Sequence, residues 1–380
     1  MKIVITGGGT GGHFYPLIAV ADKIIETSEE RKLLSPTIYY LADKEYDRKL
    51  LLRKGIYFKK ITAGKRRTYS SAKNILDVFK MAFGVIRTFF TMFSLYPDVV
   101  FTNGSYIAFP VLVACRILRI PVVVHSSDTV PGRVVLYGSK FADKISVAFK
   151  EASDDFREKD REKVAWLGNP VRDEIKKPLH NGAREFLELD TGIPTILILG
   201  GSSGAMAMND AVVDALPKLL MRYNIIHQCG RDNHDEVFGR TEVVLYDHPY
   251  KGRYKLYPYL DDLAIRMSSG AAALVISRAG AGSIFEIAQW GLPAIVIPIP
   301  NDISRDQEKN AFAYARTGAA TVMLQNNTTA GLLTSEIDRI VNDPTVQEEM
   351  KTAAKKFAKP NAAEEIANAV IDIGLSHEQS

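Results

Sequence analysis

Two glycine-rich turns of nearly the same design constrain the fold of this chain more than any other feature. The first, Gly7–His13 (GGGTGGH), follows an apolar run at residues 3–5, and the second, Gly200–Ala205 (GGSSGA), follows another at 196–199. Each pattern predicts a strand, a tight turn and the start of a helix. Such a turn leaves backbone N–H groups unpaired at the positive end of a helix, where a phosphate can bind. The repeat therefore predicts two similar α/β domains that face one cleft.

Short apolar and β-branched segments alternate with helical patterns through both halves of the chain. This alternation is typical of parallel sheets covered by helices on both faces, so we expect two Rossmann-like domains. The expected strands are Lys2–Thr6, Thr37–Leu41, Val99–Phe101, Val122–Val124 and Lys144–Val147 in the first half, and Thr195–Leu199, Asn224–Gln228, Glu242–Tyr246, Ala273–Ile276 and Ala294–Ile297 in the second.

The domain boundaries follow from length and from one proline-containing segment. A chain of 380 residues fits about two domains. The segment Gly168–Val171 is the expected crossing, because Pro170 restricts its own backbone and that of the residue before it. We expect domains at 1–169 and 170–358, and a C-terminal helix within 359–380 that packs back on the first domain.

Charge is distributed unevenly and indicates an anionic partner for the first half. Residues 1–170 hold 27 lysines and arginines against 17 acidic residues, a net charge of +10, whereas the remainder carries −6. A basic half favours phosphates or an acidic membrane surface, and no nucleic-acid-binding motif occurs. We expect a cytoplasmic location for three reasons. Cys115 and Cys229 are too few for a disulfide framework, a strand expected at Lys2 leaves no room for a signal peptide, and no apolar run is long enough to span a membrane.

Residues 72–96 form an amphipathic helix pattern with an unusually wide apolar surface. One stripe contains Ile75, Phe79, Phe83, Ile86, Phe90 and Phe93, and its neighbour contains Val78, Met81, Val85, Phe89, Met92 and Tyr96. A deeply buried helix is one interpretation. The other is that one stripe packs on the domain while the other enters a bilayer interface beside cations such as Arg87. For that interface we expect contacts from Ile75, Phe79, Phe89 and Met92.

The first glycine turn also matches a dinucleotide-binding pattern. Gly7-x-Gly9-x-x-Gly12 follows an expected strand, and Asp43 follows the next one, where a ribose-binding carboxylate would lie. An NAD(P)-dependent oxidoreductase is therefore one alternative. His13 at the first turn of the helix and the second glycine turn both favour a different chemistry.

The second half adds a polar constellation after an expected strand. The small residues of Ser277–Ser283 allow a diphosphate to approach a helix start. Glu286, in the expected first turn, either stabilises the helix dipole or accepts the hydroxyls of a ribose. Gln307, at the start of a later helix, is either a sugar ligand or part of a solvated face. The adjacent pair Asp261-Asp262 is more typical of a helix start than of a metal site.

Six motifs in a fixed order resemble the MurG family of UDP-N-acetylglucosamine transferases, which belongs to glycosyltransferase family 28. The motifs are GGGTGGH (7–13), GNPVR (168–172), GGSSGA (200–205), HQCG (227–230), SRAGAGSIFEIAQWGLP (277–293) and Asp306-Gln307-x-x-Asn310-Ala311. The resemblance covers roughly residues 2–373. It implies the two-domain glycosyltransferase-B fold, with the UDP-sugar donor on the C-terminal domain and a lipid-linked acceptor on the N-terminal one.

The same resemblance implies roles for individual residues. Donor contacts would come from Arg172, Ser202, Leu260 (through its backbone, to uracil), Ala281, Gly282, Ser283, Glu286 (to ribose) and Gln307 (to the sugar). Acceptor contacts would come from Thr10, Gly11, Gly12, His13 and Asp128. The chain departs from the family at two places. Ser126-Ser127-Asp128 stands where the family has Glu-Gln-Asn after the histidine, and Asp306-Gln307 replaces a glutamine pair.

The implied reaction is an inverting sugar transfer at the cytoplasmic face of the membrane, from UDP-N-acetylglucosamine to a polyprenyl-linked muramyl peptide, converting lipid I to lipid II. We expect backbone N–H groups, a helix dipole and Arg172 to stabilise the leaving diphosphate without a metal or cofactor. His13 or Asp128 would be the general base. Transfer to another lipid such as diacylglycerol, a sugar-nucleotide epimerase, and a non-catalytic lipid or UDP-sugar binder are further alternatives.

Overall fold

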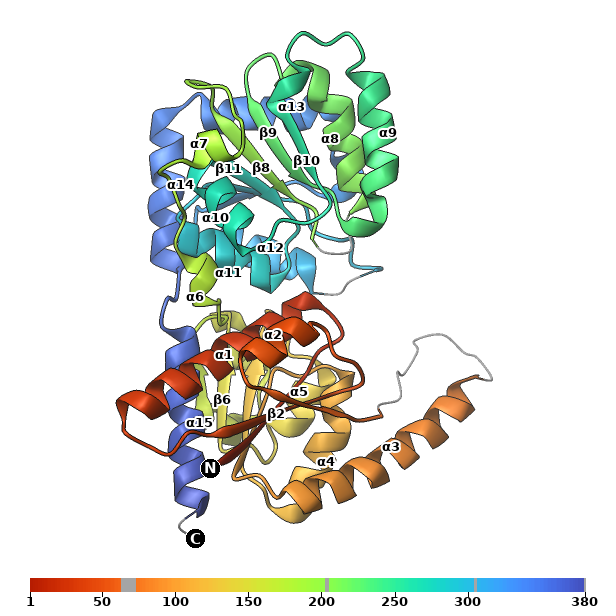
Figure 1. Cartoon of the computed structure of the whole chain (residues 1–380), viewed down its shortest axis with the longest axis vertical. Coiled ribbons are helices and arrows are strands. Elements are labelled where there is room, and N and C mark those ends of the chain that lie inside the picture. The colour runs from red at the N-terminus through yellow and green to blue at the C-terminus, as the bar shows by residue number, and fades with distance from the viewer. Residues whose placement is uncertain (63–72, 202–204, 304–305, 379–380) are drawn as a thin grey trace. The chain divides into compact units, whose positions relative to one another are not determined.

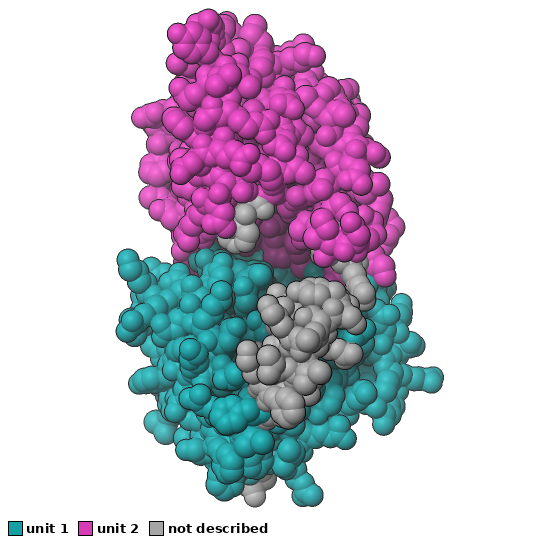
Figure 2. Space-filling model, turned by 90° about the vertical axis from the view of Figure 1, so that its right-hand side faces the viewer, with its two compact units in different colours: residues 1–172, 359–380 teal, residues 173–358 magenta. Residues whose placement is uncertain are grey.

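A computed structural model describes residues 1–62, 73–201, 205–303 and 306–378, with side chains described outside 73–82 and 378. The chain divides into two compact units, which Figure 2 distinguishes by colour. Unit 1 comprises residues 1–172 and 359–380, and unit 2 comprises residues 173–358. The expected crossing at 168–171 thus falls just before the observed one.

Unit 1 contains a parallel sheet with the strand order β3-β2-β1-β4-β5-β6-β7. Its strands are β1 (Lys2–Thr6), β2 (Thr37–Ala42), β3 (Tyr57–Lys60), β4 (Val99–Thr102), β5 (Val122–Ser126), β6 (Lys144–Val147) and β7 (Val164–Trp166). Its helices are α1 (Gly11–Glu30), α2 (Arg48–Arg53), α3 (Lys73–Leu95), α4 (Phe109–Leu118), α5 (Arg133–Gly138) and α15 (Ala362–Glu378), with 3₁₀ turns η1 (Tyr106–Ala108), η2 (Lys150–Asp155) and η3 (Glu158–Lys163).

Helix α15 comes from the far end of the chain yet belongs to the core of unit 1. Figure 1 shows this blue helix beside the red α1, and the two helices pack against each other. Ile366, Val370 and Ile371 are buried in the same apolar cluster as β1 and β4. Arg31 at the end of α1 also forms an ion pair with Asp372, with 2.6 Å between nitrogen and oxygen.

Unit 2 repeats the arrangement with the order β10-β9-β8-β11-β12-β13. Its strands are β8 (Thr195–Leu199), β9 (Asn224–Gln228), β10 (Tyr254–Tyr257), β11 (Ala272–Ser277), β12 (Ala294–Val296) and β13 (Ala320–Val322). Its helices are α6 (Asp173–Lys176), α7 (Ala183–Phe186), α8 (Met206–Leu219), α9 (His234–Val244), α10 (Asp262–Ala271), α11 (Ala281–Trp290), α12 (Gln307–Ala315), α13 (Ala330–Val341) and α14 (Pro344–Phe357), with 3₁₀ turns η4 (Arg231–Asn233), η5 (Lys251–Arg253) and η6 (Gln325–Asn327).

One expected strand is wrong, and the others overlap observed strands. Residues 242–244 complete helix α9, whose first turn contains Asp235 and Glu236. The run that suggested a strand is mostly exposed: the side chains of Val243 and Tyr246 are 78% and 77% exposed, and of the residues 243–246 only Leu245 is buried. The edge of this sheet is formed instead by β10. The edge strands β3, β7 and β13 are short or polar and had no strong sequence signal.

The two sheets change direction at equivalent places, and this feature positions the candidate site. In each, the first strand of the unit lies between its second and fourth strands, so the chain runs outward to both sides from there. In open parallel sheets, ligands bind beyond the carboxyl ends of the strands at such a switch point. The glycine turns follow β1 and β8, which are these switch-point strands.

Candidate functional site

Polar side chains from the neighbouring strands pack closely against the first glycine turn, which precedes α1. Gly7 and Gly8 have φ values of +144° and +142°, and a side chain at either would collide with Asn103 or with the hydroxyl of Tyr40. Tyr40 donates a hydrogen bond of 3.0 Å to the carbonyl of Gly7. Thr10, Gly11 and Gly12, expected at the acceptor site, form the N-cap and first residues of α1. The turn is thus fixed by packing.

His13 lies in the first turn of α1, as predicted. The side-chain amide of Asn103, just after β4, donates a hydrogen bond to the His13 carbonyl oxygen. The ring Nδ1 of His13 is buried and has no hydrogen-bond partner in the described part of the chain. Burial lowers the pKa of His13 below 6.5, and the negative charge of Asp128 opposes this shift. A neutral imidazole at neutral pH is the form that a general base requires.

His125 is a second buried histidine of unit 1, but its two ring nitrogens are already occupied. Nδ1 lies 2.9 Å from the Ser146 hydroxyl and Nε2 lies 3.0 Å from Oδ1 of Asn169. Burial lowers the pKa of His125 to about 4. Asn169, from the GNPVR motif, therefore connects the domain crossing to β5. Asp128 follows β5 by a short turn in which the Ser126 hydroxyl donates to the Asp128 carbonyl at 3.4 Å.

Two other expected polar residues of unit 1, Arg172 and Asp43, each contact a tyrosine side chain. Arg172 is buried, and its guanidinium carbon lies 4.1 Å from the centre of the Tyr15 ring on α1. Asp43 follows β2 and accepts a hydrogen bond of 3.3 Å from the Tyr106 hydroxyl. Arg172 therefore belongs by its packing to unit 1, whereas its expected role concerns the donor.

The second phosphate-type turn of unit 2 is the start of α11. Ala281, Gly282 and Ser283 are the first three residues of this helix, with Gly280 as the N-cap. A side chain added at Gly280 or Gly282 would meet no atom within 4 Å, so open space lies against the helix start. This geometry suits an anion. The expected phosphate contact Ser202 lies outside the described residues.

Glu286 lies one turn later than the sequence suggested. Because α11 begins at Ala281, the helix has no acidic residue in its first turn, and Glu286 is half-buried in the second. Stabilisation of the helix dipole falls off within the first turn. The structure thus removes the dipole explanation for this carboxylate.

Gln307 and Asn310 connect α12 to the loops that precede it. The Gln307 side chain accepts a hydrogen bond of 3.1 Å from the Ile299 amide, and Asn310 donates one of 3.3 Å to the Ala279 carbonyl. Arg278 donates to the Ile297 carbonyl at 3.1 Å. The solvated-face interpretation of Gln307 is therefore wrong, because its side chain holds the loop after β12. Its expected sugar contact stays a prediction.

Leu260 and the aspartates after it also have defined positions. The Leu260 side chain is buried, and its amide donates a hydrogen bond of 3.0 Å to Oε1 of Gln228. Asp261 is the N-cap of α10 and accepts a hydrogen bond of 2.9 Å from the Ala264 amide. The predicted helix start at Asp261-Asp262 is confirmed. Within the described residues, no cluster of three His, Cys, Asp or Glu side chains is arranged to hold a metal ion.

Helix α3 exposes one of its two apolar stripes. Phe83, Phe90 and Phe93 are 63%, 64% and 61% exposed, whereas Met92 is fully buried in the core of unit 1. The expected membrane contact of Met92 is therefore wrong, and Phe89 is only partly exposed because it packs against that core. The side chains of Ile75 and Phe79 lie outside the described ones. Figure 1 shows α3 alongside α4, where Ile117 is also exposed.

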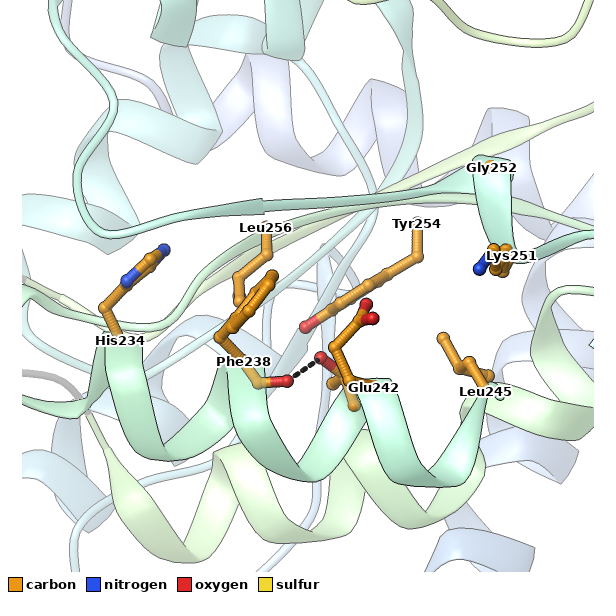
Figure 3. A pocket seen from close by; sticks show the side chains of 9 residues that line it. His234, Phe238, Glu242, Leu245, Lys251, Gly252, Tyr254 and Leu256 are labelled. Atoms are coloured by element: carbon orange, nitrogen blue, oxygen red, sulfur yellow. Dashed lines mark hydrogen bonds between the residues drawn. The ribbon is translucent and has the colours of Figure 1, made fainter. Parts of the chain in front are cut away.

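A pocket of about 410 Å³ occurs elsewhere in unit 2, between α9 and β10. Figure 3 shows His234, Phe238 and Glu242 of α9 on one side of it and Tyr254 and Leu256 of β10 on the other. It contains none of the residues that the sequence assigned to the donor. No helix of the described chain is both long enough and apolar enough to cross a membrane.

Two family models match the chain, one in each half. The glycosyltransferase family 28 N-terminal domain matches residues 3–147, and the glycosyltransferase family 28 C-terminal domain matches residues 195–366.

Individual proteins match over nearly the full length. A protein of Treponema denticola, named UDP-N-acetylglucosamine--N-acetylmuramyl-(pentapeptide) pyrophosphoryl-undecaprenol N-acetylglucosamine transferase, is 35% identical over 85% of this chain and 83% of its own length. A Treponema pallidum protein of the same name is 34% identical over 96% of this chain and 94% of its own. The crystal structure of Acinetobacter baumannii MurG superposes with a TM-score of 0.71 at 26% identity, covering 98% of this chain and 99% of the other.

Proposed function

Since this chain belongs to glycosyltransferase family 28, we propose that it transfers N-acetylglucosamine from UDP-N-acetylglucosamine to a lipid-linked N-acetylmuramyl pentapeptide, converting lipid I to lipid II. The observation that carries this proposal is the similarity to transferases named for this reaction, which extends over both units. The two parallel-sheet units are those expected of the glycosyltransferase-B fold. The family match favours this function over the nicotinamide oxidoreductase that the first glycine turn alone allowed.

The donor is assigned to unit 2. The α11 start offers three successive N–H groups and open space to the diphosphate, and Glu286 on the same helix would accept the ribose hydroxyls. Gln307 would contact the sugar through its side-chain NH₂, because its Oε1 already accepts the Ile299 amide. Fixed N–H dipoles of this kind stabilise a leaving diphosphate as its negative charge develops. Arg172, Ser202 and Leu260, the last through its backbone to the base, complete the proposed donor set.

The proposed chemistry is a single displacement at the anomeric carbon. The acceptor hydroxyl oxygen forms a bond to this carbon as the bond to the UDP oxygen breaks, so the configuration inverts from α to β. The hydroxyl proton passes to the imidazole of His13, whose pKa is held low by burial. Thr10, Gly11 and Gly12 would contact the acceptor, and UDP leaves with the bonding electron pair.

The pH dependence distinguishes His13 from Asp128 as the base. The charge of Asp128 raises the pKa of His13. Replacing Asp128 with Asn therefore makes the imidazole harder to protonate, and we expect the acid limb of kcat/KM to move to lower pH while turnover at neutral pH persists. Measuring the pH profile checks this, with Asp98→Asn at the amino end of β4 as the control. Loss of turnover at every pH in Asp128→Asn would instead identify Asp128 as the base.

The function itself is tested with two panels of substrates. Purified protein is assayed for transfer from UDP-N-acetylglucosamine, UDP-glucose and UDP-galactose to lipid I and to diacylglycerol, and NADH binding is measured alongside. Product formed from UDP-N-acetylglucosamine and lipid I supports the proposal. Faster transfer to diacylglycerol would instead favour the alternative function, a sugar transferase acting on another lipid. The departures from the family at Ser126-Ser127-Asp128 and Asp306 are the reason for testing this alternative.

We also propose that unit 1 binds the cytoplasmic face of the membrane through the exposed stripe of α3. Phe83, Ile86, Phe90 and Phe93 form this stripe, and Arg87 lies exposed on the same helix. Ile117, Arg116 and Arg119 are exposed at the end of the neighbouring α4. Aromatic side chains beside cations are the combination that favours an anionic bilayer interface.

Vesicle binding tests this surface. In Phe90→Glu/Phe93→Glu, we expect binding to phosphatidylglycerol vesicles to fall by at least about tenfold, because two large apolar contacts are lost and two negative charges are added. Co-sedimentation measures the effect. The control is Val243→Glu/Tyr246→Glu, which changes two large side chains of unit 2 that are even more exposed than Phe90 and Phe93. Equal binding by all three proteins would remove the stripe from membrane attachment.

A further inference from the structure

Gln228 occupies the point in unit 2 where two parts of the candidate nucleotide site meet. It is the last residue of β9, which lies between β8 and β10 in the sheet. In the strand register Gln228 stands beside Leu199 on β8 and Tyr257 on β10. The second glycine turn follows β8, and the segment that contains Leu260 follows β10. A residue at this position can therefore form hydrogen bonds to the glycine turn and to the Leu260 segment at the same time.

The backbone and the side chain of Gln228 each hold one of these segments. Its carbonyl oxygen accepts a hydrogen bond of 2.9 Å from the Gly200 amide, the first N–H of the glycine turn. Its buried side-chain Oε1 accepts the Leu260 amide at 3.0 Å. Gly200 must be glycine, because a Cβ there would lie only 2.9 Å from the same carbonyl oxygen.

The residues after Gln228 fix the rest of the Leu260 segment. The Cys229 amide donates a hydrogen bond of 3.0 Å to the Tyr257 carbonyl. The guanidinium carbon of Arg231 lies 4.6 Å from the centre of the Tyr259 ring. Asp261 then caps helix α10. The chain from 257 to 261 is therefore held at successive positions, and its peptide groups have a defined orientation.

The hydrogen bond from Leu260 decides which of its backbone groups remains for a ligand. Its N–H is taken by Gln228, whereas its carbonyl oxygen accepts no hydrogen bond from the described part of the chain. A carbonyl oxygen can only accept hydrogen bonds, so a ligand group that binds it must be a donor. Uracil carries an N–H at ring position 3, whereas the equivalent nitrogen of cytosine has only a lone pair.

We propose that Gln228 is a positioning residue for base recognition: by occupying the N–H of Leu260 it leaves only the carbonyl oxygen of this residue for the base, which selects a uridine over a cytidine nucleotide. This inference rests on the proposed function in taking Leu260 as the contact of the base. In this proposal Gln228 would touch neither the sugar nor the reacting carbon, because its side-chain Oε1 and its carbonyl oxygen are hydrogen-bonded to Leu260 and Gly200. Its loss would therefore change the KM for the donor and the choice of base, and leave kcat largely unchanged.

The test compares UDP and CDP affinities by calorimetry in full-length protein. We expect the wild type to prefer UDP by at least roughly tenfold, because cytosine would leave the carbonyl facing a lone pair. Gln228→Met removes the acceptor at similar volume, and its UDP/CDP ratio should fall toward unity. Gln228→Glu keeps an acceptor oxygen and should retain the UDP/CDP ratio, even if its negative charge lowers the affinity for both nucleotides. If the Met variant is unstable, Gln228→Asn withdraws the acceptor by shortening the side chain.

A matched control is available in the same unit. Gln347 on α14 also uses its side chain to bond a backbone group, donating 2.7 Å to the Val341 carbonyl. Gln347→Met should leave the UDP/CDP ratio unchanged. An equal loss of UDP and CDP affinity in Gln228→Met would overturn the inference, as would a wild type that does not distinguish the two nucleotides. Sugar transfer is assayed separately, so base selection without transfer would instead count against the proposed function.

Discussion

In His13→Ala, kcat is expected to fall by about two to four orders of magnitude while UDP binding stays unchanged. A positioned general base contributes about 10²- to 10⁴-fold to a rate, and the ring of His13 lies in the first turn of α1. The UDP affinity should persist because the proposed donor contacts other than Arg172 lie in unit 2. Steady-state kinetics with a lipid I substrate and calorimetry with UDP measure the two quantities.

The structure also indicates how to separate a catalytic loss from a folding defect. Asn103 bonds the backbone carbonyl of residue 13 and not its ring, so the turn keeps this contact when the ring is removed. We therefore expect a thermal midpoint close to that of the wild type and partial rescue of His13→Ala by added imidazole. Turnover equal to that of the wild type would exclude His13 from proton transfer.

In Glu286→Ala, UDP affinity is expected to fall by about 1–3 kcal/mol, which is roughly five- to 150-fold. The half-buried carboxylate is not explained by the helix dipole, since α11 begins one turn earlier. Losing it would leave two ribose hydroxyls without acceptors in the bound state, and an unpaired buried polar group costs this amount. Calorimetry with UDP and with free uracil separates the ribose contribution from that of the base.

Glu308 supplies the control for this prediction. It also lies early in a helix of unit 2, and its carboxylate accepts the Asn301 amide at 3.2 Å. Glu308→Ala should affect that loop without a comparable loss of UDP affinity. If the two variants bind UDP equally well, Glu286 has no part in holding the ribose.

The parts of the fold that depend on local pattern were predictable. Buried central strands such as β1, β5 and β8 contain continuous apolar runs of three or more residues, so their sequences specify them. The run 242–246 has the same composition but continues a helix that is already under way from His234. Composition alone does not distinguish an exposed helix end from a strand, because burial depends on what packs against it.

The candidate site was predictable only where its residues are neighbours in sequence. The turn at 7–13 and the start of α11 are contiguous segments, so their chemistry is visible in the motif. The partners of this chemistry come from elsewhere: Asn103 is 90 residues from His13, and Gln228 is 32 residues from Leu260. Single polar residues after unrelated strands give no signal, and only the parallel topology brings them to one edge of the sheet.

The return of α15 to unit 1 has a consequence for how the protein is made. Unit 2 is one continuous stretch, 173–358, whereas the core of unit 1 needs Ile366, Val370 and Ile371. A ribosome therefore delivers everything required for unit 2 before it delivers the helix that closes unit 1. We expect nascent chains in which unit 2 has already folded while the apolar residues of β1 and β4 are not yet covered by α15. At this stage unit 1 exposes an apolar surface to which chaperones can bind.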